Sequence, residues 1–458
     1  MEYSWERDEE EKNIKNYFSK ENLELILKNE NIDKTKSCGI DKISSKKLIE
    51  NKEKILGDIN KSIINGTYKF TPYKIKLISK GPDKAPRVTC IPTIKDRIVI
   101  ATIKRFLYDS YPNIKFNISA NTIVRNTIEI KEEGKFDCFI KLDLTNFFGS
   151  IDQELLIEIL RKQIKNESII KLIKDIITNP RKYTEFDERK KVYTGIPQGL
   201  SISVLLANIY LHELDEKFEK SKKMKIFRYV DDILIFCNEE DAEEIKSKLI
   251  VELKMKYSLQ VNKDKYSFGK LTDEFEFLGY RFFDDVISVR KSSKIKFEQS
   301  LETMFKKFSR IKDKNEKEVE RFIWMLNYKI CGIVNENKRY GWLYYYSCIT
   351  DEKILYELDG FIIKLIKRFK LEGLIDLRRI KKFVKAYHEI KDRFSISNYL
   401  LKYNNITFEE MCDFIEKVCG VDLDRTSVNG LELERKFKYC FFNMVVKKLE
   451  RDLDDISR

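Results

Sequence analysis

Two adjacent carboxylates, Asp231 and Asp232, are the residues in this sequence that most strongly suggest chemistry. They separate two short runs rich in β-branched and aromatic residues, 227–230 and 233–236. This pattern predicts a β-hairpin with both carboxylates at its tip. Like charges in a buried turn repel each other and resist the loss of water, an objection that a bound divalent cation would remove. The alternative is an ordinary solvated turn, where acidic residues are common.

A third carboxylate stands where an earlier apolar run ends. Residues 139–144 predict a strand that reaches Asp143. Taken alone, Asp143 is better explained as a strand-end or helix-capping residue. Together with Asp231 and Asp232, it makes the minimal protein site for two divalent cations about 4 Å apart, one activating an attacking hydroxyl and one carrying a leaving pyrophosphate. Magnesium prefers such carboxylate oxygens, so the three aspartates predict an enzyme that joins nucleotides.

The elements that must position these residues follow from the periodicity of the chain. Strands are predicted at 67–79 and 88–92, on either side of a loop with glycine and proline, and again at 275–290. Apolar residues at helical spacing predict helices at 95–108, 152–178, 203–220 and 240–257. Long Lys- and Glu-rich helical segments fill the chain from residue 294 to the end. Residues 1–60 are also predicted to be helical.

The composition indicates what kind of molecule this protein binds and in which cell compartment it is found. A net charge of +13 over 458 residues favours a polyanionic partner, with nucleic acid first, although a lysine-rich proteome would give the same excess. Nine cysteines without a C-x-x-C pair predict reduced thiols and no zinc site. Two histidines exclude a multi-histidine metal site. Without a signal core or an apolar run of membrane-spanning length, we expect a cytoplasmic protein that does not enter membranes.

Six blocks between about residues 35 and 290 resemble, in order and spacing, those of bacterial reverse transcriptases, the family that includes group II intron, retron and antiphage enzymes. Residues 229–232, Tyr-Val-Asp-Asp, resemble the family's Tyr-x-Asp-Asp box. The other matching blocks are the fingers block at 78–97, the first catalytic block at 141–152, the substrate-binding block at 194–203, and the two following blocks at 259–265 and 277–280.

The resemblance implies an α+β right-hand polymerase fold. It consists of fingers and a palm with an antiparallel sheet and helices, followed by an all-helical thumb and a C-terminal extension. The corresponding regions are 1–60 leading into the fingers, 61–290 for fingers and palm, 294–390 for the thumb, and 391–458 for the extension. The implied partners are an RNA template, a dedicated non-coding RNA among the options, with dNTPs and a DNA product. A second copy of the chain or a partner protein is a further option.

The resemblance also assigns roles within the catalytic cluster. Asp143, Asp231 and Asp232 would be catalytic and, with the Leu144 backbone, would hold two Mg²⁺ ions, with Mn²⁺ as the alternative. Lys265 would protonate the leaving pyrophosphate. For Lys265 the alternative is a solvated surface cation.

Further residues would bind the substrates. Lys80 and Arg87 would fold over the triphosphate and spread its charge, unless they are surface cations. Phe148 would crowd the sugar 2′ position, unless it is a core residue. The remaining nucleotide contact would be Gln198, and the primer and template contacts would be Gly199, Tyr229, Leu278, Gly279 and Tyr280.

Departures from the family pattern suggest a subclass. Val204 follows Ser203 where mobile-element relatives have proline, and Val230 stands where retrons and group II introns mostly have alanine. These features, with the long helical C-terminus, are similar to the unknown-group and abortive-infection enzymes. We therefore expect an RNA-directed DNA polymerase of antiphage defence. The alternatives are a retron-like or intron-derived enzyme that serves its own element, and a catalytically silent RNA-binding scaffold.

Overall fold

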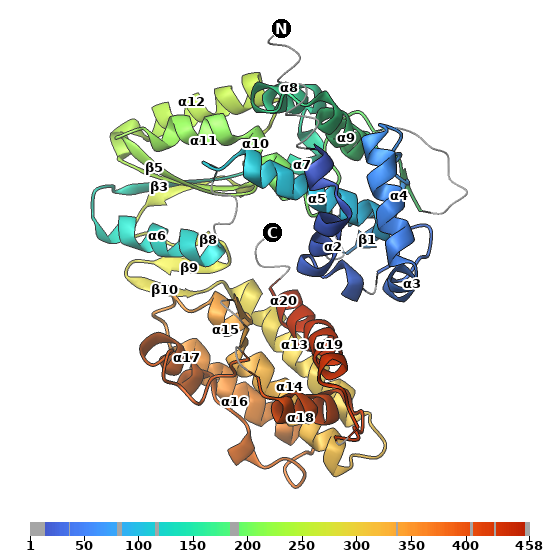
Figure 1. Cartoon of the computed structure of the whole chain (residues 1–458). Helices are drawn as coiled ribbons and strands as arrows, with labels where there is room; N and C mark the ends of the chain where they lie inside the picture. The colour runs from blue at the N-terminus through green and yellow to red at the C-terminus, as the bar shows by residue number, and fades with distance from the viewer. Residues whose placement is uncertain are drawn as a thin grey trace. The chain divides into compact units, whose positions relative to one another are not determined.

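The computed structural model describes residues 14–35, 37–79, 85–114, 119–183, 192–335, 338–403, 406–425 and 427–453. The chain forms two compact units, drawn in Figure 1. The first unit contains residues 1–118 and 136–268, and the second contains residues 119–135 and 269–458. The change of unit at residue 268 comes earlier than the change of composition near 294 from which the sequence predicts a boundary.

The N-terminal part of the first unit combines helices with a small sheet. Helices α2 (Lys20–Asn29), α4 (Lys52–Ile64) and α5 (Ile94–Ser110) pack on one another, and α3 (Ser45–Glu50) precedes α4. Strand β1 (Tyr73–Ile78) pairs antiparallel with β2 (Arg87–Ile91) and parallel with β4 (Arg181–Lys182).

The first of these strands is shorter than the predicted 67–79. The backbone N–H of Thr71 donates to Asp96 Oδ2 at 3.1 Å, and the Tyr68 hydroxyl donates to Asp96 Oδ1 at 2.8 Å. Pro72 has no N–H for a sheet ladder. Residues 67–72 therefore bind a buried carboxylate and do not extend the strand.

A four-stranded sheet forms the centre of the first unit. Its order is β5 (Met224–Tyr229), β6 (Asp232–Cys237), β3 (Cys138–Asp143) and β7 (Ser267–Lys270). Helices α11 (His212–Glu219) and α12 (Glu239–Tyr257) contact β5 and β3 and lie along one face of the sheet in Figure 1. Residues 233–237 are all buried, which explains their continuous apolar run. The hairpin predicted at 227–236 is therefore present.

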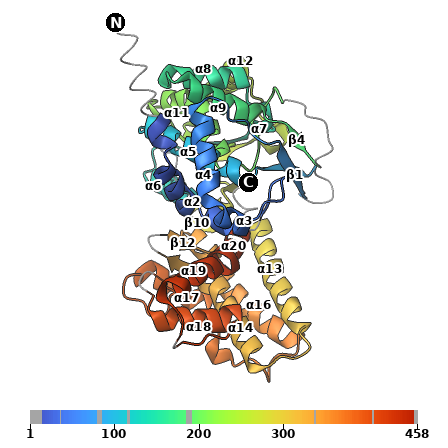
Figure 2. The same ribbon diagram turned by 45° about the vertical axis from the view of Figure 1, so that its right-hand side comes forward.

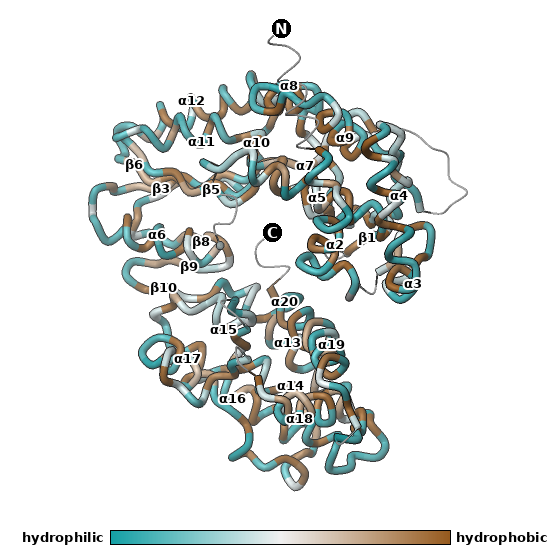
Figure 3. Tube along the Cα trace, viewed as in Figure 1, coloured by the Kyte–Doolittle hydropathy of each residue, from teal (hydrophilic) through white to brown (hydrophobic). Residues whose placement is uncertain are grey.

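Four further helices, α7 (Phe147–Ser150), α8 (Gln153–Gln163), α9 (Glu167–Thr178) and α10 (Ser203–Tyr210), complete this unit. Brown and teal segments alternate along α8, α9 and α12 in Figure 3, as expected for helices with one apolar face. The helices predicted to fill 152–178 are α8 and α9, which separate where Asn166 caps α9 by accepting from the N–H groups of Ser168 and Ile169. Likewise, 203–220 divides into α10 and α11.

The second unit begins with a helix inserted from earlier in the chain. Helix α6 (Ala120–Glu132) lies beside a sheet with the order β10 (Val286–Val289), β9 (Tyr280–Phe283) and β8 (Phe275–Phe277) (Figure 1). Lys131 Nζ donates to the carbonyl of Asp284 at 2.6 Å, and Asn121 Nδ2 donates to that of Tyr344 at 2.7 Å. These long-range contacts explain why residues 119–135 leave the unit that precedes them in sequence.

Helices make up most of the rest of the second unit. Figure 2 shows α18 and α19 beside α14, at the red end of the chain. Trp342 is fully buried and stacks on Phe297 with ring centroids 4.6 Å apart. The helices are α13 (Lys291–Ser309), α14 (Glu316–Cys331), α15 (Trp342–Tyr345), α16 (Lys353–Arg368), α17 (Phe383–Asp392), α18 (Phe408–Cys419), α19 (Gly430–Cys440) and α20 (Lys447–Arg451), with a π-helical turn at Phe441–Val446.

The prediction that this C-terminal region is entirely helical is wrong. Strands β11 (Ile333–Asn335) and β12 (Lys338–Tyr340) pair antiparallel within it. Gly332, with a φ of +66°, ends α14 in a conformation that side-chain-bearing residues avoid. The β-branched residues Ile333 and Val334 follow and favour an extended chain.

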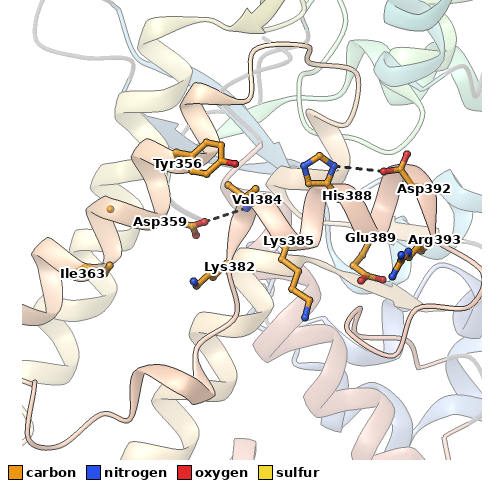
Figure 4. A pocket seen from close by; sticks show the side chains of 11 residues that line it. Tyr356, Asp359, Ile363, Lys382, Val384, Lys385, His388, Glu389, Asp392 and Arg393 are labelled. Atoms are coloured by element: carbon orange, nitrogen blue, oxygen red, sulfur yellow. Dashed lines mark hydrogen bonds and ion pairs between the residues drawn. The ribbon is translucent and has the colours of Figure 1, made fainter.

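A pocket of about 630 Å³ lies between α16 and α17 (Figure 4). Its polar groups bind one another: Asp359 accepts from the backbone N–H groups of Phe383 and Val384 at the start of α17, and His388 lies 3.7 Å from Asp392. Among the described residues, no two cysteines form a disulfide. In the described part of the chain, no helix combines the length and apolarity needed to cross a bilayer.

Candidate active site

Strand pairing brings the three aspartates of the sequence prediction together. In the antiparallel pair of β3 and β6, Asp143 lies directly opposite Asp232. In the neighbouring pair, Tyr229 lies opposite Asp232, so Val230 and Asp231 form a two-residue turn. The backbone N–H of Leu144 donates to the carbonyl of Asp231 at 3.2 Å. Side chains directly opposite on neighbouring strands lie about 4.5–5.5 Å apart at Cβ, so the acidic groups share one small region.

Burial makes this concentration of negative charge unfavourable. Burial raises the pKa of Asp232 to about 6, and the nearby Lys141 opposes this rise while Asp231 and Asp143 add to it. Burial also raises the pKa of Asp231, again with a contribution from Asp143. Burial and mutual repulsion therefore both disfavour the charged forms of Asp231 and Asp232.

Two lysines lie against the carboxylates. Lys265 Nζ donates to Asp143 Oδ1 at 2.8 Å, and Lys141 Nζ lies 4.0 Å from Asp232 Oδ1. The Lys265 side chain is 58% exposed, whereas that of Asp143 is 15% exposed. Lys265 can therefore swing into solvent without a large loss of packing, and Asp143 cannot.

These residues fit a divalent cation, although the described residues contain no group of three acidic, histidine or cysteine side chains already arranged as a ligand set. All candidate donors are oxygens, from the three carboxylates and the Leu144 backbone, which suits a hard cation such as Mg²⁺. The raised pKa values of Asp231 and Asp232 indicate buried charge that a cation would stabilise.

The segment after α12 positions Lys265. The backbone N–H of Thr145 donates to the Gln260 carbonyl at 2.8 Å, and that of Asn262 donates to the Asp143 carbonyl at 2.7 Å. Asn262 then caps the short 3₁₀ helix Lys263–Lys265. Residues 260–262 thus continue the pairing at the end of β3 and place Lys265 beside it.

Residues 194–203, predicted to bind substrate, connect α7 to β2. Ile196 N–H donates to the Phe148 carbonyl, and Cys90 N–H donates to the Gln198 carbonyl, both at 2.7 Å. Gly199 has a φ of +93°, and a Cβ there would lie 2.4 Å from Thr89 Cγ2. Glycine is therefore required at 199 by the close approach of β2.

The other predicted nucleotide contacts, and Tyr229 from the predicted primer and template contacts, belong to the first unit where the structure describes them. Arg87 begins β2, and its charge opposes the rise in the pKa of Asp231, which places it near the aspartates. Phe148 is half-buried, with its ring centroid 5.6 Å from that of Phe147. Tyr229 is half-buried at the end of β5. Lys80 lies outside the described residues.

The predicted primer-binding turn belongs to the second unit. Leu278 and Gly279, with φ values of +49° and +79°, form the two-residue turn between β8 and β9. The Leu278 and Tyr280 side chains are buried, and the Tyr345 hydroxyl donates to the Leu278 carbonyl at 2.8 Å. The turn is present as predicted, but only its backbone is left to hold a primer.

Sequence reasoning missed the residues that support the hairpin tip. Arg228 donates to Val230, Asn208 and Asp215, and none of these contacts was predicted. The available signal was a basic residue directly before the Tyr-Val-Asp-Asp box, in a strand that is otherwise largely apolar.

Comparison with known proteins agrees with this geometry. Residues 78–282 match the family model described as reverse transcriptase (RNA-dependent DNA polymerase). The matched residues include Asp143, Asp231 and Asp232.

Relatives of this chain include a group II intron-encoded protein and a retron reverse transcriptase. The group II intron-encoded protein LtrA of Lactococcus lactis subsp. cremoris is 33% identical over 184 residues, which cover 38% of this chain and 30% of LtrA. The retron Ec83 reverse transcriptase of Escherichia coli is 32% identical over 139 residues, or 28% of this chain and 43% of that enzyme. The chain therefore spans less than half the length of either relative.

Among solved structures, telomerase from Candida albicans aligns with a TM-score of 0.44 and 15% identity, covering 89% of this chain and 67% of the telomerase. A score this low supports no conclusion about this chain.

Proposed function

We propose that this protein is an RNA-directed DNA polymerase that adds dNTPs to a DNA strand by two-metal phosphoryl transfer. The observation that carries the proposal is the register that sets Asp143 opposite Asp232, with Asp231 in the adjoining turn, inside the region that matches reverse transcriptases. The relatives named as a group II intron protein and a retron reverse transcriptase support the same activity.

The carboxylates of Asp143, Asp231 and Asp232, with the Leu144 backbone carbonyl, would hold Mg²⁺ or Mn²⁺. Two such ions, when bound, activate an attacking hydroxyl and neutralise a leaving pyrophosphate. Lys265, which pairs with Asp143 in this structure, would be released toward solvent and would donate a proton to the pyrophosphate.

Other residues of the chain would hold the substrates. Arg87 and Lys80 would bind the triphosphate, and Phe148 would restrict the space at the sugar 2′ position. Gln198 would contact the nucleotide. Gly199 and Tyr229, with the turn from Leu278 to Tyr280, would contact primer and template.

Primer extension with matched variants tests the proposal. The protein is supplied with an RNA template, a DNA primer, dNTPs and MgCl₂. Replacing Asp231 and Asp232 by alanine is expected to abolish incorporation while leaving folding and RNA binding. Asp264→Ala is the matched control, because Asp264 is an exposed aspartate of the adjoining 3₁₀ helix. Undiminished incorporation by the double variant would reject a polymerase built on these residues.

For the biological role, we propose antiphage defence in the cytoplasm, supported by the departures at Val204 and Val230 and by the long C-terminal region. Sequencing of RNA that co-purifies with the protein, together with phage plating on cells that carry wild-type or Asp231→Ala protein, tests this role. Protection that needs Asp231 supports defence. A structured intron or retron transcript without protection favours service to a mobile element.

A further inference from the structure

The tip of the aspartate hairpin has an unfavourable backbone conformation. Val230 has a φ of +60°, in the left-handed region that β-branched residues strongly avoid. It is the first residue of the two-residue turn between Tyr229 and Asp232, and Asp231, the second, does not share a positive φ. Turns of this pattern normally take glycine at the first position. The local sequence therefore does not stabilise the turn that carries Asp231.

The buried side chain of Arg228 forms a hydrogen bond to this turn. Arg228 Nη1 donates to the Val230 carbonyl at 3.0 Å. The same guanidinium donates to Asn208 Oδ1 of α10 at 3.2 Å and to Asp215 Oδ1 of α11 at 2.7 Å, and its Nη2 donates to Asp215 Oδ2. The Arg228 side chain is only 8% exposed. The guanidinium thus connects the turn to α10 and to α11, which packs on β5.

These contacts orient the residue that bears the carboxylate. The Val230 carbonyl belongs to the peptide group directly before Asp231, and Arg228 holds it. The Asp231 carbonyl belongs to the peptide group directly after it, and the Leu144 N–H holds that group at 3.2 Å. With both flanking peptide groups held, the direction of the Asp231 Cα–Cβ bond is set, and the carboxylate can move only by rotation of its side-chain torsions.

We propose that Arg228, held by Asp215 and Asn208, is a positioning residue that keeps Val230 in its strained conformation and thereby aims the Asp231 carboxylate at a divalent cation. This inference rests on the proposed function, because it requires a cation at Asp143, Asp231 and Asp232. The guanidinium is suited to the task because its planar fork donates at once to acceptors on three residues. A lysine at the same position keeps the charge but cannot reproduce the four directed bonds.

Titration of the protein with MnCl₂ alone tests the inference without requiring activity. The electron spin resonance signal of free Mn²⁺ reports how much of the ion is bound. We expect Arg228→Lys to bind Mn²⁺ about tenfold more weakly than the wild type, or about 1.4 kcal/mol, and to need a higher Mg²⁺ concentration for primer extension. Arg161→Lys is the matched control, because Arg161 also forms a two-bond pair, with Glu167, but on the exposed surface. It should leave Mn²⁺ affinity unchanged.

A rescue separates positioning from general stability. Glycine adopts a positive φ without strain, so adding Val230→Gly to Arg228→Lys should restore most of the lost Mn²⁺ affinity while leaving the melting temperature low. If Arg228→Lys does not fold, Asp215→Asn takes its place, with and without Val230→Gly. Asp215→Asn weakens the hydrogen bonds that hold the Arg228 guanidinium in position.

The outcomes are distinct. Wild-type Mn²⁺ affinity in Arg228→Lys, or a loss that Val230→Gly does not restore, would overturn the positioning role and leave the proposed function standing. Failure of the wild type itself to bind Mn²⁺ or to extend a primer would overturn the proposed function, and this inference with it.

Discussion

Replacement of Asp232 by asparagine should stabilise the metal-free protein at neutral pH. Burial raises the pKa of Asp232 from 3.8 to about 6, so folding disfavours the charged form by about 3 kcal/mol, at 1.36 kcal/mol for each pKa unit. Asparagine keeps the shape and removes the charge, but its amide must still be desolvated and Lys141 loses its partner. The expected gain is therefore about 1–3 kcal/mol.

The pH dependence follows from the direction of this change. The pKa of Asp232 is higher in the folded than in the unfolded protein. Asp232 therefore does not lower the free energy of unfolding below about pH 3.8, where the carboxyl is protonated in both states. The cost grows as pH rises toward 6 and is complete above it. The advantage of Asp232→Asn should therefore be full at pH 7.5 and should shrink steadily below pH 6.

Thermal unfolding in EDTA at pH 7.5 and at pH 4.5 measures this advantage. A gain of about 1–3 kcal/mol corresponds to a rise of roughly 2–8 °C for a unit of this size. Addition of MgCl₂ should raise the melting temperature of the wild type and not that of the variant. Asp264→Asn, which removes an exposed carboxylate nearby, controls for net charge. A variant that melts below the wild type at pH 7.5 in EDTA, or an advantage independent of pH, would refute the reasoning.

Three further changes test separate parts of the structure. Phe148→Ala should admit ribonucleotides, seen as rCTP incorporation in primer extension that approaches that of dCTP; continued exclusion would show that Phe148 is only a packing residue. Lys265→Ala removes the 2.8 Å pair with Asp143 and should lower the single-turnover rate about 10²-fold or more, the usual contribution of a general acid, without weakening Mn²⁺ binding; an unchanged rate would exclude that role. Trp342→Ala removes a fully buried ring stacked on Phe297 and should destabilise the second unit by about 3–5 kcal/mol in urea unfolding, while Mn²⁺ affinity, which depends on the first unit, stays at the wild-type value.

Short-range patterns were sufficient to predict the hairpin and the strand that carry the three aspartates. Alternating and continuous apolar runs define β5, β6 and β3 because strand formation there depends on side chains within a few positions. The same reasoning failed at 67–72 and at β11 and β12. In the first case the backbone N–H of Thr71 donates to Asp96, a carboxylate distant in sequence. In the second case the β-branched residues after Gly332 favour strand locally, but the segments on either side are predicted to be helical.

By itself, the sequence determined which residues could do chemistry here and the local elements that carry them: three aspartates, a lysine at 265, and a hairpin with two carboxylates at its tip. Only the tertiary structure decided that Asp143 faces Asp232 across a strand pair and that Lys265 reaches Asp143 from 122 positions away. It also decided that Arg228 of β5 links the Val230 carbonyl to α10 and α11. The reason is physical: strand formation depends on nearby side chains, whereas register and long-range hydrogen bonds depend on how distant segments pack together.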